Sequence, residues 1–359
     1  MIGRLVAAAA AVVVTLALPA HALAGEWVAG DLHVHTTYSH DSYGGPGDDN
    51  TGIDEAYTAG HSVTSDFAIA LSRGLDYLAI TDHNDVRSQS DPGFGFGGVI
   101  AVPGYENSLR GHGQMLGARR IYDKGDSGPA AVAAMADELR ADGGVFQANH
   151  PSDPLWAYGY EVPVDSVEVW NLPWPYQPPL PSADDNDYAV SYWEGWLDRG
   201  AHVAATGGSD SHWLSTTAAQ GPGQPTTWVY VEERSARGVL EGIRAGHTFV
   251  SHQPPAYGGP RAFLEADADH DGSYERMVGD TAPPGAALRV RVLGAPGAFL
   301  RVVTDGGKEA FAPVLVTSPA FEHRFRLRGR RSWVRAEVYA ADRTVGMLAL
   351  TSALYLRTR

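Results

Sequence analysis

Histidine and carboxylate residues recur at one place in this sequence, beside the C-terminal ends of successive strand-like segments. The segment 30–35 ends in His33 and His35, and the segment 76–81 is followed directly by Asp82. Because side chains two residues apart on a strand share a face, His33 and His35 can bind one ion together. His83 comes next after Asp82, Glu106, His150, Asp210 and His212 follow the ends of later segments, and His112 stands at the start of the segment after Glu106. This arrangement predicts a metal centre at the end of the strands where parallel α/β barrels form their active sites.

The strand-like segments alternate with helix-like ones over residues 27–251. We expect strands at 30–35, 76–81, 99–105, 114–121, 145–148, 166–169, 202–205 and 227–231, and helices at 65–72, 129–141, 188–199 and 235–245. This alternation favours parallel pairing, as in an α/β barrel or an open sheet. After residue 254 the helical patterns stop, and alternating apolar and polar residues between 288 and 350 predict a small antiparallel β-sandwich.

The first 24 residues have the layout of a secretory signal peptide. Arg4 precedes an apolar run over residues 5–18, and Ala22-Leu23-Ala24 forms a small-residue cleavage pattern. The run is shorter than the ~20 apolar residues that span a bilayer, so we expect no stable membrane insertion. We therefore expect a secreted or periplasmic protein with a signal peptide at 1–24, a barrel at 25–253 and a β-sandwich at 254–359.

The composition limits both the metal chemistry and the partners. The 359 residues include no cysteine, which excludes disulfides, thiolate zinc sites and thiol nucleophiles. Any metal ion must therefore be bound through nitrogen and oxygen. A formal net charge of −15 argues against nucleic acid as a partner, because phosphate binding requires a basic surface. The sequence does not indicate an oligomeric state.

Five motifs resemble, in their order, those of the PHP (polymerase and histidinol phosphatase) family of metal-dependent hydrolases. They occupy residues 33–41, 80–83, 104–106, 149–151 and 208–212. The segment 227–251, with the β-rich tail that follows it, is similar to the CehA/McbA-like secreted branch of that family. The resemblance implies an α/β fold with a distorted (β/α)7 barrel, followed by the small antiparallel β-sandwich, and a site for three metal ions.

The resemblance also implies a role for each residue of that site. The first ion would be bound by His33, His35, Glu106 and Asp210. Glu106 would bridge to a second ion, bound also by His112 and His150, with Gln114 as an alternative to His112. The third ion would be bound by His83, His212 and either Asp41 or His40, of which Asp41 has the better spacing from His33.

These ligands point to hydrolysis by an activated water molecule. Imidazole and carboxylate groups suit Zn²⁺, Mn²⁺ or Fe²⁺, and we expect two or three such ions. A hydroxide bridging two ions would be the nucleophile. The expected catalytic residues are Glu106, His150 and Asp210 as metal ligands, and Asp82. The proton for the leaving group would come either from Asp82 or from a metal-bound water.

The substrate class follows from the resemblance alone. The family favours a small-molecule phosphoester, whereas its secreted branch supports a carboxyl or carbamate ester as the alternative. The same metal site serves both reactions. A third hypothesis, of another class, is a non-catalytic extracellular binding module with a degenerate barrel.

A separate acidic segment has the spacing of a cation site. Asp267, Asp269 and Asp271 alternate along the chain ahead of Gly272, as in the first half of a calcium-binding loop. The twelfth position holds Val278 where such loops have glutamate, and no helical pattern flanks the segment. A Ca²⁺ site and a plain acidic turn therefore both agree with the sequence.

Aromatic residues gather around a proline-rich insertion at 173–187. They are Trp170, Trp174, Tyr176, Trp193 and Trp196. They could form the wall of a substrate pocket, or they could pack the insertion against the barrel.

Overall fold

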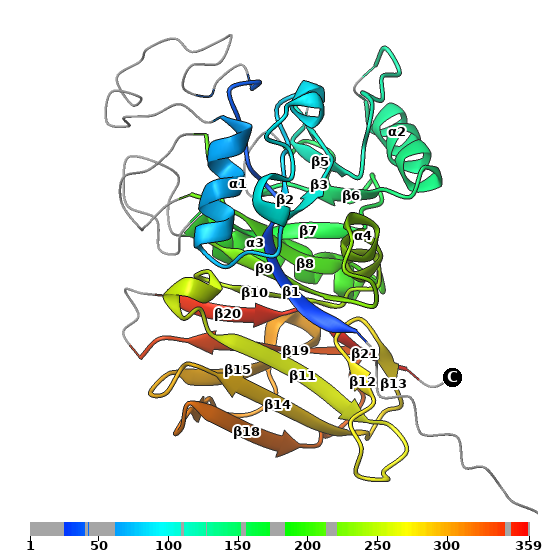
Figure 1. Ribbon diagram of the computed structural model, residues 1–359. Coiled ribbons are helices and arrows are strands. Elements are labelled where there is room, and N and C mark those ends of the chain that lie inside the picture. The colour runs from blue at the N-terminus through cyan, green and yellow to red at the C-terminus, as the bar shows by residue number, and fades with distance from the viewer. Residues whose placement is uncertain are drawn as a thin grey trace, which may run out of the picture.

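The computed structural model describes residues 25–39, 42, 62–108, 111–126, 128–151, 156–172, 184–212, 221–341 and 346–357. The expected signal peptide, His40 and Asp41 lie outside these ranges. Within them the chain has a mixed α/β fold with four α-helices and three β-sheets (Figure 1). The helices surround the N-terminal part, and the C-terminal part consists almost entirely of strands.

The largest sheet contains strands from both ends of the chain. Strands β1 (Glu26–Asp31), β2 (Tyr77–Ala79) and β3 (Ile100–Val102) pair in parallel. Strand β9 (Thr226–Val231) adds antiparallel to β1, and β10 (Thr248–Ser251) adds antiparallel to β9. Strand β10 also pairs with β20 (Met347–Thr351), so the sheet continues from the expected barrel into the expected β-sandwich.

A second sheet of five strands also belongs to the N-terminal part. It contains, in spatial order, β4 (Glu106–Asn107), β5 (Gly113–Leu116), β6 (Val145–Ala148), β7 (Ser166–Asn171) and β8 (Ala204–Gly208). Strands β6, β7 and β8 are parallel, whereas β4 and β5 form a hairpin because only a short connection separates them. In the described residues, single bridges between Val34 and Ser211 and between His83 and Glu106 connect the two sheets. The expected closed barrel with parallel pairing is therefore not confirmed.

The four helices occur where the sequence predicts them. They are α1 (Val63–Ser72), α2 (Pro129–Ala141), α3 (Asp184–Asp198) and α4 (Ala236–Arg244). Ser62 and Ser235 cap α1 and α4, because each hydroxyl accepts a hydrogen bond from a backbone N–H in the first turn. Short 3₁₀ turns occupy η2 (Arg87–Ser90), η3 (Phe96–Gly98), η4 (Pro255–Tyr257) and η5 (Asp305–Gly307). No helix of the described ranges is long and apolar enough to cross a membrane.

The C-terminal part is built from two packed β-layers. One is the antiparallel sheet of β12 (Arg276–Met277), β11 (Arg261–Asp267), β14 (Ala287–Leu293) and β18 (Ala320–Phe325). The other continues the largest sheet through β13 (Thr281–Ala282), β15 (Phe299–Thr304), β16 (Lys308–Glu309), β17 (Val314–Leu315), β19 (Trp333–Tyr339) and β21 (Leu354–Leu356). Every second residue of β14 is buried, and these residues pack on Leu300, Val302 and Ala336 of the facing layer.

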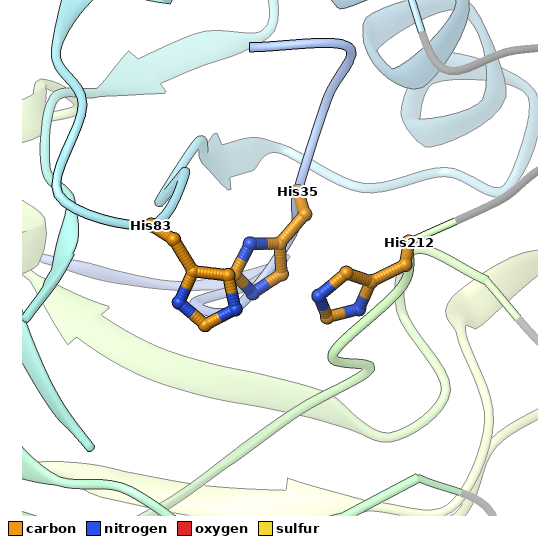
Figure 2. Close-up of side chains that lie close together, drawn as sticks. All are labelled: His35, His83 and His212. Carbon is orange, nitrogen blue, oxygen red and sulfur yellow. The ribbon is translucent and has the colours of Figure 1, made fainter. Parts of the chain in front are cut away.

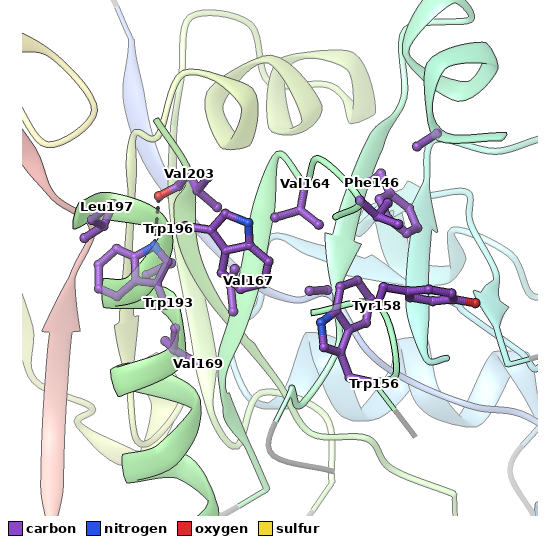
Figure 3. Packing of buried hydrophobic residues seen from close by; sticks show 14 of the residues in the cluster. Phe146, Trp156, Tyr158, Val164, Val167, Val169, Trp193, Trp196, Leu197 and Val203 are labelled. Atoms are coloured by element: carbon purple, nitrogen blue, oxygen red, sulfur yellow. Dashed lines mark hydrogen bonds between the residues drawn. The ribbon is translucent and has the colours of Figure 1, made fainter. Parts of the chain in front are cut away.

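The aromatic residues beside the insertion form part of a hydrophobic core. Trp170, Trp193 and Trp196 are all at least 95 % buried in one apolar cluster. Figure 3 shows Trp193 and Trp196 in this cluster with Val169 and Val203. The indole N–H of Trp193 donates to the carbonyl of Val203 at 3.0 Å. These contacts favour the packing interpretation for the described aromatic residues. Trp174 and Tyr176 lie outside the described ranges.

Candidate metal centre

Backbone pairing brings three of the predicted ligands together, namely His33, His35 and Asp210. The backbone N–H of His35 donates to the carbonyl of Ser211 at 2.9 Å, and that of Asp210 donates to the carbonyl of His33 at 2.9 Å. A methyl group in place of the hydrogen of Gly208 would lie 2.3 Å from Cβ of His33, so this close approach requires glycine. The segment after β1 is therefore held against the segment after β8, and Asp210 lies beside both histidines.

Four ligand atoms converge at this point. Nε2 of His33 lies 3.0 Å from Nε2 of His35, and both nitrogens lie 3.1–3.2 Å from Oδ1 of Asp210. Oε2 of Glu106 lies 3.3 Å from Nε2 of His33 and 3.4 Å from that of His35. His33, His35 and Glu106 are at most 1 % exposed.

The donor set of this cluster fits a divalent cation. Oδ1 of Asp210 is buried without a well-directed hydrogen bond from the described residues, although imidazole nitrogens of His33, His35 and His212 lie 3.1–3.5 Å from it. Protons between neighbouring pairs could not satisfy four mutually close atoms, whereas one ion can accept an electron pair from each. Imidazole nitrogen and carboxylate oxygen are the ligands that Zn²⁺, Mn²⁺ and Fe²⁺ accept.

The carboxylate of Glu106 lies between two groups of histidines. Its Oε2 faces His33 and His35, and it lies 3.2 Å from Nδ1 of His83. Its Oε1 lies 3.0 Å from Nδ1 of His112 and 3.5 Å from Nε2 of His150. One oxygen therefore faces each group, which is the arrangement of a carboxylate that bridges two ions.

A third group consists of three imidazoles. His35, His83 and His212 each offer a nitrogen within 4.8 Å of the others (Figure 2). The rings of His35 and His212 stack with centroids 3.9 Å apart, and those of His35 and His83 lie 4.5 Å apart. The further ligand predicted for this position, Asp41 or His40, lies outside the described residues.

Glu168 is a buried carboxylate that the sequence motifs did not indicate. It lies on β7 and is 0 % exposed, with Oε1 at 2.9 Å from Nδ1 of His33. Its Oε2 accepts hydrogen bonds from the backbone N–H of His150 and from the side-chain amide of Asn171, both at 3.1 Å. A carboxylate on the outer nitrogen of a histidine orients the other nitrogen toward a metal. A single acid inside the apolar segment 166–170 was the signal that could have identified it.

Asp31 is a second carboxylate that was not predicted, at the end of β1. It is fully buried and accepts hydrogen bonds from the backbone N–H groups of His33, Ser209 and Gly223 at 2.7–3.1 Å. Burial raises the pKa of Asp31 to about 6, although these hydrogen bonds lower it. Through these hydrogen bonds Asp31 holds together the segments that contain His33, Ser209 and Gly223.

Two other predicted residues have specific partners. The buried carboxylate of Asp82 accepts hydrogen bonds from the backbone N–H of Thr36 at 2.6 Å and from its hydroxyl at 2.9 Å. Burial raises the pKa of Asp82 to about 6, against the effect of these bonds.

The side-chain amide of Gln114 donates to Thr81 at 3.2 Å, whereas His112 contacts Glu106. Of the two alternatives, the geometry favours His112 as a ligand.

The charges of the cluster stabilise one another. Burial alone lowers the pKa of His33, but Asp210, Glu168 and Glu106 hold it well above its ordinary value. Burial raises the pKa values of Glu106 and Asp210, but the charge of His33 and contacts with other histidines hold both well below the usual range. Both shifts favour the ionised form of the two carboxylates, which is the form that binds a cation.

Two residues of the centre have strained backbone conformations. His150 has a φ of 24° and Asp210 a φ of 48°, a region that side chains other than glycine rarely adopt. Such strain persists where the surroundings determine the conformation, and it is common at functional sites. Here the hydrogen bonds from His150 to Glu168 and from Asp210 to His33 hold both backbones in place.

Comparison with known proteins gives a partial match and a distant structural similarity. Residues 25–90, which include His33, His35 and His83, match a family model described as "Protein of unknown function (DUF3604)". No curated protein matches the chain. Among solved structures, the chain is similar to a two-domain protein from Bacteroides vulgatus ATCC 8482, described as containing a predicted PHP-like metal-dependent phosphoesterase. The two are 15 % identical over 92 % of this chain and 96 % of that one, with a TM-score of 0.45.

Proposed function

We propose that this protein is a metal-dependent hydrolase of the PHP type that cleaves small-molecule phosphoesters. The observation that carries the proposal is the carboxylate of Glu106, whose two oxygens face two separate groups of histidines, one buried and one partly exposed. A binding module would not need such a concentration of imidazoles and acids, which is costly to bury without ions. The order of the five sequence motifs supports a phosphoester as the substrate.

The proposed ligands divide into three sets. His33, His35, Glu106 and Asp210 bind the first ion. Glu106, His112 and His150 bind the second. His83 and His212 bind the third, with Asp41 or His40, and His35 lies within reach of this ion as well. Zn²⁺, Mn²⁺ and Fe²⁺ all accept these donors, and when bound they would activate water and stabilise negative charge on the attacked group.

Neighbouring residues of the chain orient the ligands. Asn149 donates a hydrogen bond to Oε1 of Glu106 at 2.8 Å, which holds that carboxylate between the two histidine groups. The hydroxyl of Ser39 accepts from the backbone N–H of His83 at 2.9 Å and lies 2.8 Å from Nδ1 of His35. Through these contacts Nε2 of His35 is directed at the cluster.

Asp82 is our candidate for the proton delivered to the leaving group. Burial raises its pKa to about 6, which allows the carboxyl group to carry a proton in mildly acidic solution. Its hydrogen bonds with Thr36 hold it against the residue that follows His35.

We further propose that the protein is exported and works outside the cytoplasm. The layout of residues 1–24 supports a cleaved signal peptide. The remaining chain would comprise the catalytic part, 25–253, and the β-sandwich, 254–359. Because β10 and β20 pair across this boundary, the two parts would not move independently.

A chromogenic hydrolysis panel tests the proposed activity. Purified protein supplied with Mn²⁺ or Zn²⁺ is compared on nitrophenyl phosphate mono- and diesters, nitrophenyl acetate and a naphthyl carbamate. We expect turnover of the phosphoesters, and a loss of at least about 100-fold in His150→Ala because one ion loses a ligand. His323→Ala is the matched control, since His323 lies on β18 beside Phe311, in the β-sandwich.

The outcomes of the panel separate the alternatives. Preference for the acetate or carbamate would assign the enzyme to the carboxyl or carbamate ester class with the same metal site. Absence of turnover on every substrate, with metals bound, would contradict the hydrolase proposal and favour the binding module. Equal activity in His150→Ala and His323→Ala would refute the role of the centre.

A further inference from the structure

The acidic loop between β11 and β12 gathers three carboxylates at one point. Asp267, at the end of β11, and Asp269 and Asp271 in the loop each offer an oxygen within 4.8 Å of the others. The loop belongs to the C-terminal layers, beside β12 in Figure 1. It contributes no residue to the candidate metal centre.

The environment of Asp267 indicates that this loop binds a ligand. The residue is 5 % exposed, and its Oδ1 is buried without a hydrogen-bond partner among the described residues. Its other oxygen accepts a hydrogen bond from the backbone N–H of Gly272 at 3.2 Å. A buried carboxylate oxygen without a partner is costly, and binding to a cation removes that cost.

The loop backbone holds the other two carboxylates in place. Asp269 accepts a hydrogen bond from the backbone N–H of Asp271 at 3.2 Å, and Asp271 accepts one from Ser273 at 2.7 Å. Each carboxylate therefore has one oxygen bound to the backbone and a second oxygen available to a ligand. Within the described ranges, no arginine or lysine forms an ion pair with any of the three aspartates.

We propose that Asp267, Asp269 and Asp271 bind a Ca²⁺ ion. Ca²⁺ is bound by oxygen ligands at 2.3–2.6 Å, so two oxygens of one ion can lie up to about 5.2 Å apart, and the three aspartate oxygens lie within that span. The three ligands offer oxygen only, which suits Ca²⁺ better than Zn²⁺. Bound there, the ion connects the buried end of β11 to the exposed loop and stabilises the β-sandwich.

The missing twelfth ligand sets the expected affinity. Loops of high affinity have a bidentate glutamate at this position, but here it holds Val278, which is 2 % exposed and packs in the core. Glu275 is engaged by the backbone N–H of Ala268 at 3.1 Å and helps to close the loop. We therefore expect a dissociation constant on the order of 10⁻⁴ to 10⁻³ M, in the range of weak modules.

Equilibrium dialysis of the full chain against ⁴⁵Ca²⁺, together with the unfolding temperature, tests the site. The variant Asp269→Asn/Asp271→Asn changes two exposed residues and keeps the hydrogen-bonding oxygens. The matched control is Asp123→Asn/Asp126→Asn. Both control residues are exposed and accept a backbone hydrogen bond two residues ahead, in the same way.

We expect the wild type and the control to bind one Ca²⁺ more per chain than the loop variant. Millimolar Ca²⁺ should raise the unfolding temperature of the first two proteins but not that of the loop variant. Without Ca²⁺ the loop variant should be at least as stable as the wild type, because charge repulsion in the loop is relieved. Equal Ca²⁺ binding by all three proteins, or an equal stabilisation by Mg²⁺, would overturn the proposal.

Discussion

Replacing Glu168 by glutamine should weaken metal binding although Glu168 is not one of the proposed ligands. In the structure Oε1 of Glu168 lies 2.9 Å from Nδ1 of His33, and Oε2 accepts the backbone N–H of His150 at 3.1 Å. A glutamine side chain has only one acceptor oxygen for these two partners. If that oxygen accepts from His33, the amide NH₂ faces the N–H of His150. If the amide is turned over, its NH₂ faces Nδ1 of His33 and favours the tautomer with a proton on Nε2, the nitrogen that we propose binds the ion.

The size of the effect follows from this conflict. Loss of an outer partner of a ligating histidine typically lowers metal affinity by about 10- to 100-fold. That range corresponds to about 1.4–2.8 kcal/mol of binding free energy. The neutral glutamine also removes one of the carboxylates that raise the pKa of His33, so protons should compete less with metal at this residue. We therefore expect a loss near the lower end of the range at acidic pH and near the upper end at neutral pH.

Competition with a chromophoric chelator measures the effect directly. The Zn²⁺ and Mn²⁺ affinities of wild type and Glu168→Gln are titrated at pH 6 and pH 7.5. Glu265→Gln provides the control, because Glu265 is a half-buried glutamate of the β-sandwich that pairs with Arg289 and Arg291. An affinity of Glu168→Gln within twofold of the wild type at both pH values would refute the proposed orienting role.

Three further predictions concern the charges of the protein. The folded state holds the pKa of Asp82 at about 6, against an ordinary value of 3.8, so its folded form binds a proton that the unfolded form has lost between these values. The contribution of Asp82 to the free energy of unfolding should fall by on the order of 2–3 kcal/mol as pH rises from about 4 to 7. Urea unfolding in the presence of a metal chelator should show this fall in the wild type and not in Asp82→Asn. A pH-independent difference between the two proteins would contradict the prediction. His212→Ala should lose one bound ion per chain by elemental analysis, and an unchanged metal content would remove His212 from the ligand set. Arg335 is 2 % exposed and pairs with the buried Glu337, so Arg335→Ala should lower the free energy of unfolding by about 3–5 kcal/mol. The exposed Arg237, changed in the same way, should cost less than about 1 kcal/mol, and equal effects would disprove the argument.

The candidate metal ligands at the strand ends could be predicted from the sequence, because residue type and spacing are local properties. His33 and His35 stand two residues apart at the end of an apolar segment, and a strand places such residues on one face. The absence of cysteine excludes thiolate ligands in whatever way the chain folds. Helices α1 and α4 were predicted at 65–72 and 235–245 for a similar reason, since helical patterning is local, and the structure shows that Ser62 and Ser235 cap them.

Glu168 and Asp31 were not predicted, because a single acid in an apolar segment gives no sign of its partner. Glu168 meets His33 only where β7 lies beside the end of β1, 135 residues apart in the chain. The pairing of β10 with β20 was missed for the same reason, since strand order depends on contacts between distant segments. The expected parallel barrel rested on the alternation of strands and helices, which does not specify the direction of β4, β5, β9 and β10.

The amino-acid sequence determined the chemistry of the candidate metal centre: which residue types it contains, at which strand ends they stand, and that no sulfur takes part. The tertiary structure decided which atoms of those residues lie close together. It directs one oxygen of Glu106 toward His33 and the other toward His112, and it leaves one oxygen of Asp267 buried and unsatisfied in the acidic loop. Ligand identity is a property of each residue alone, whereas the sharing of an ion requires atoms from distant segments within a few ångströms. Only the folded chain brings them that close.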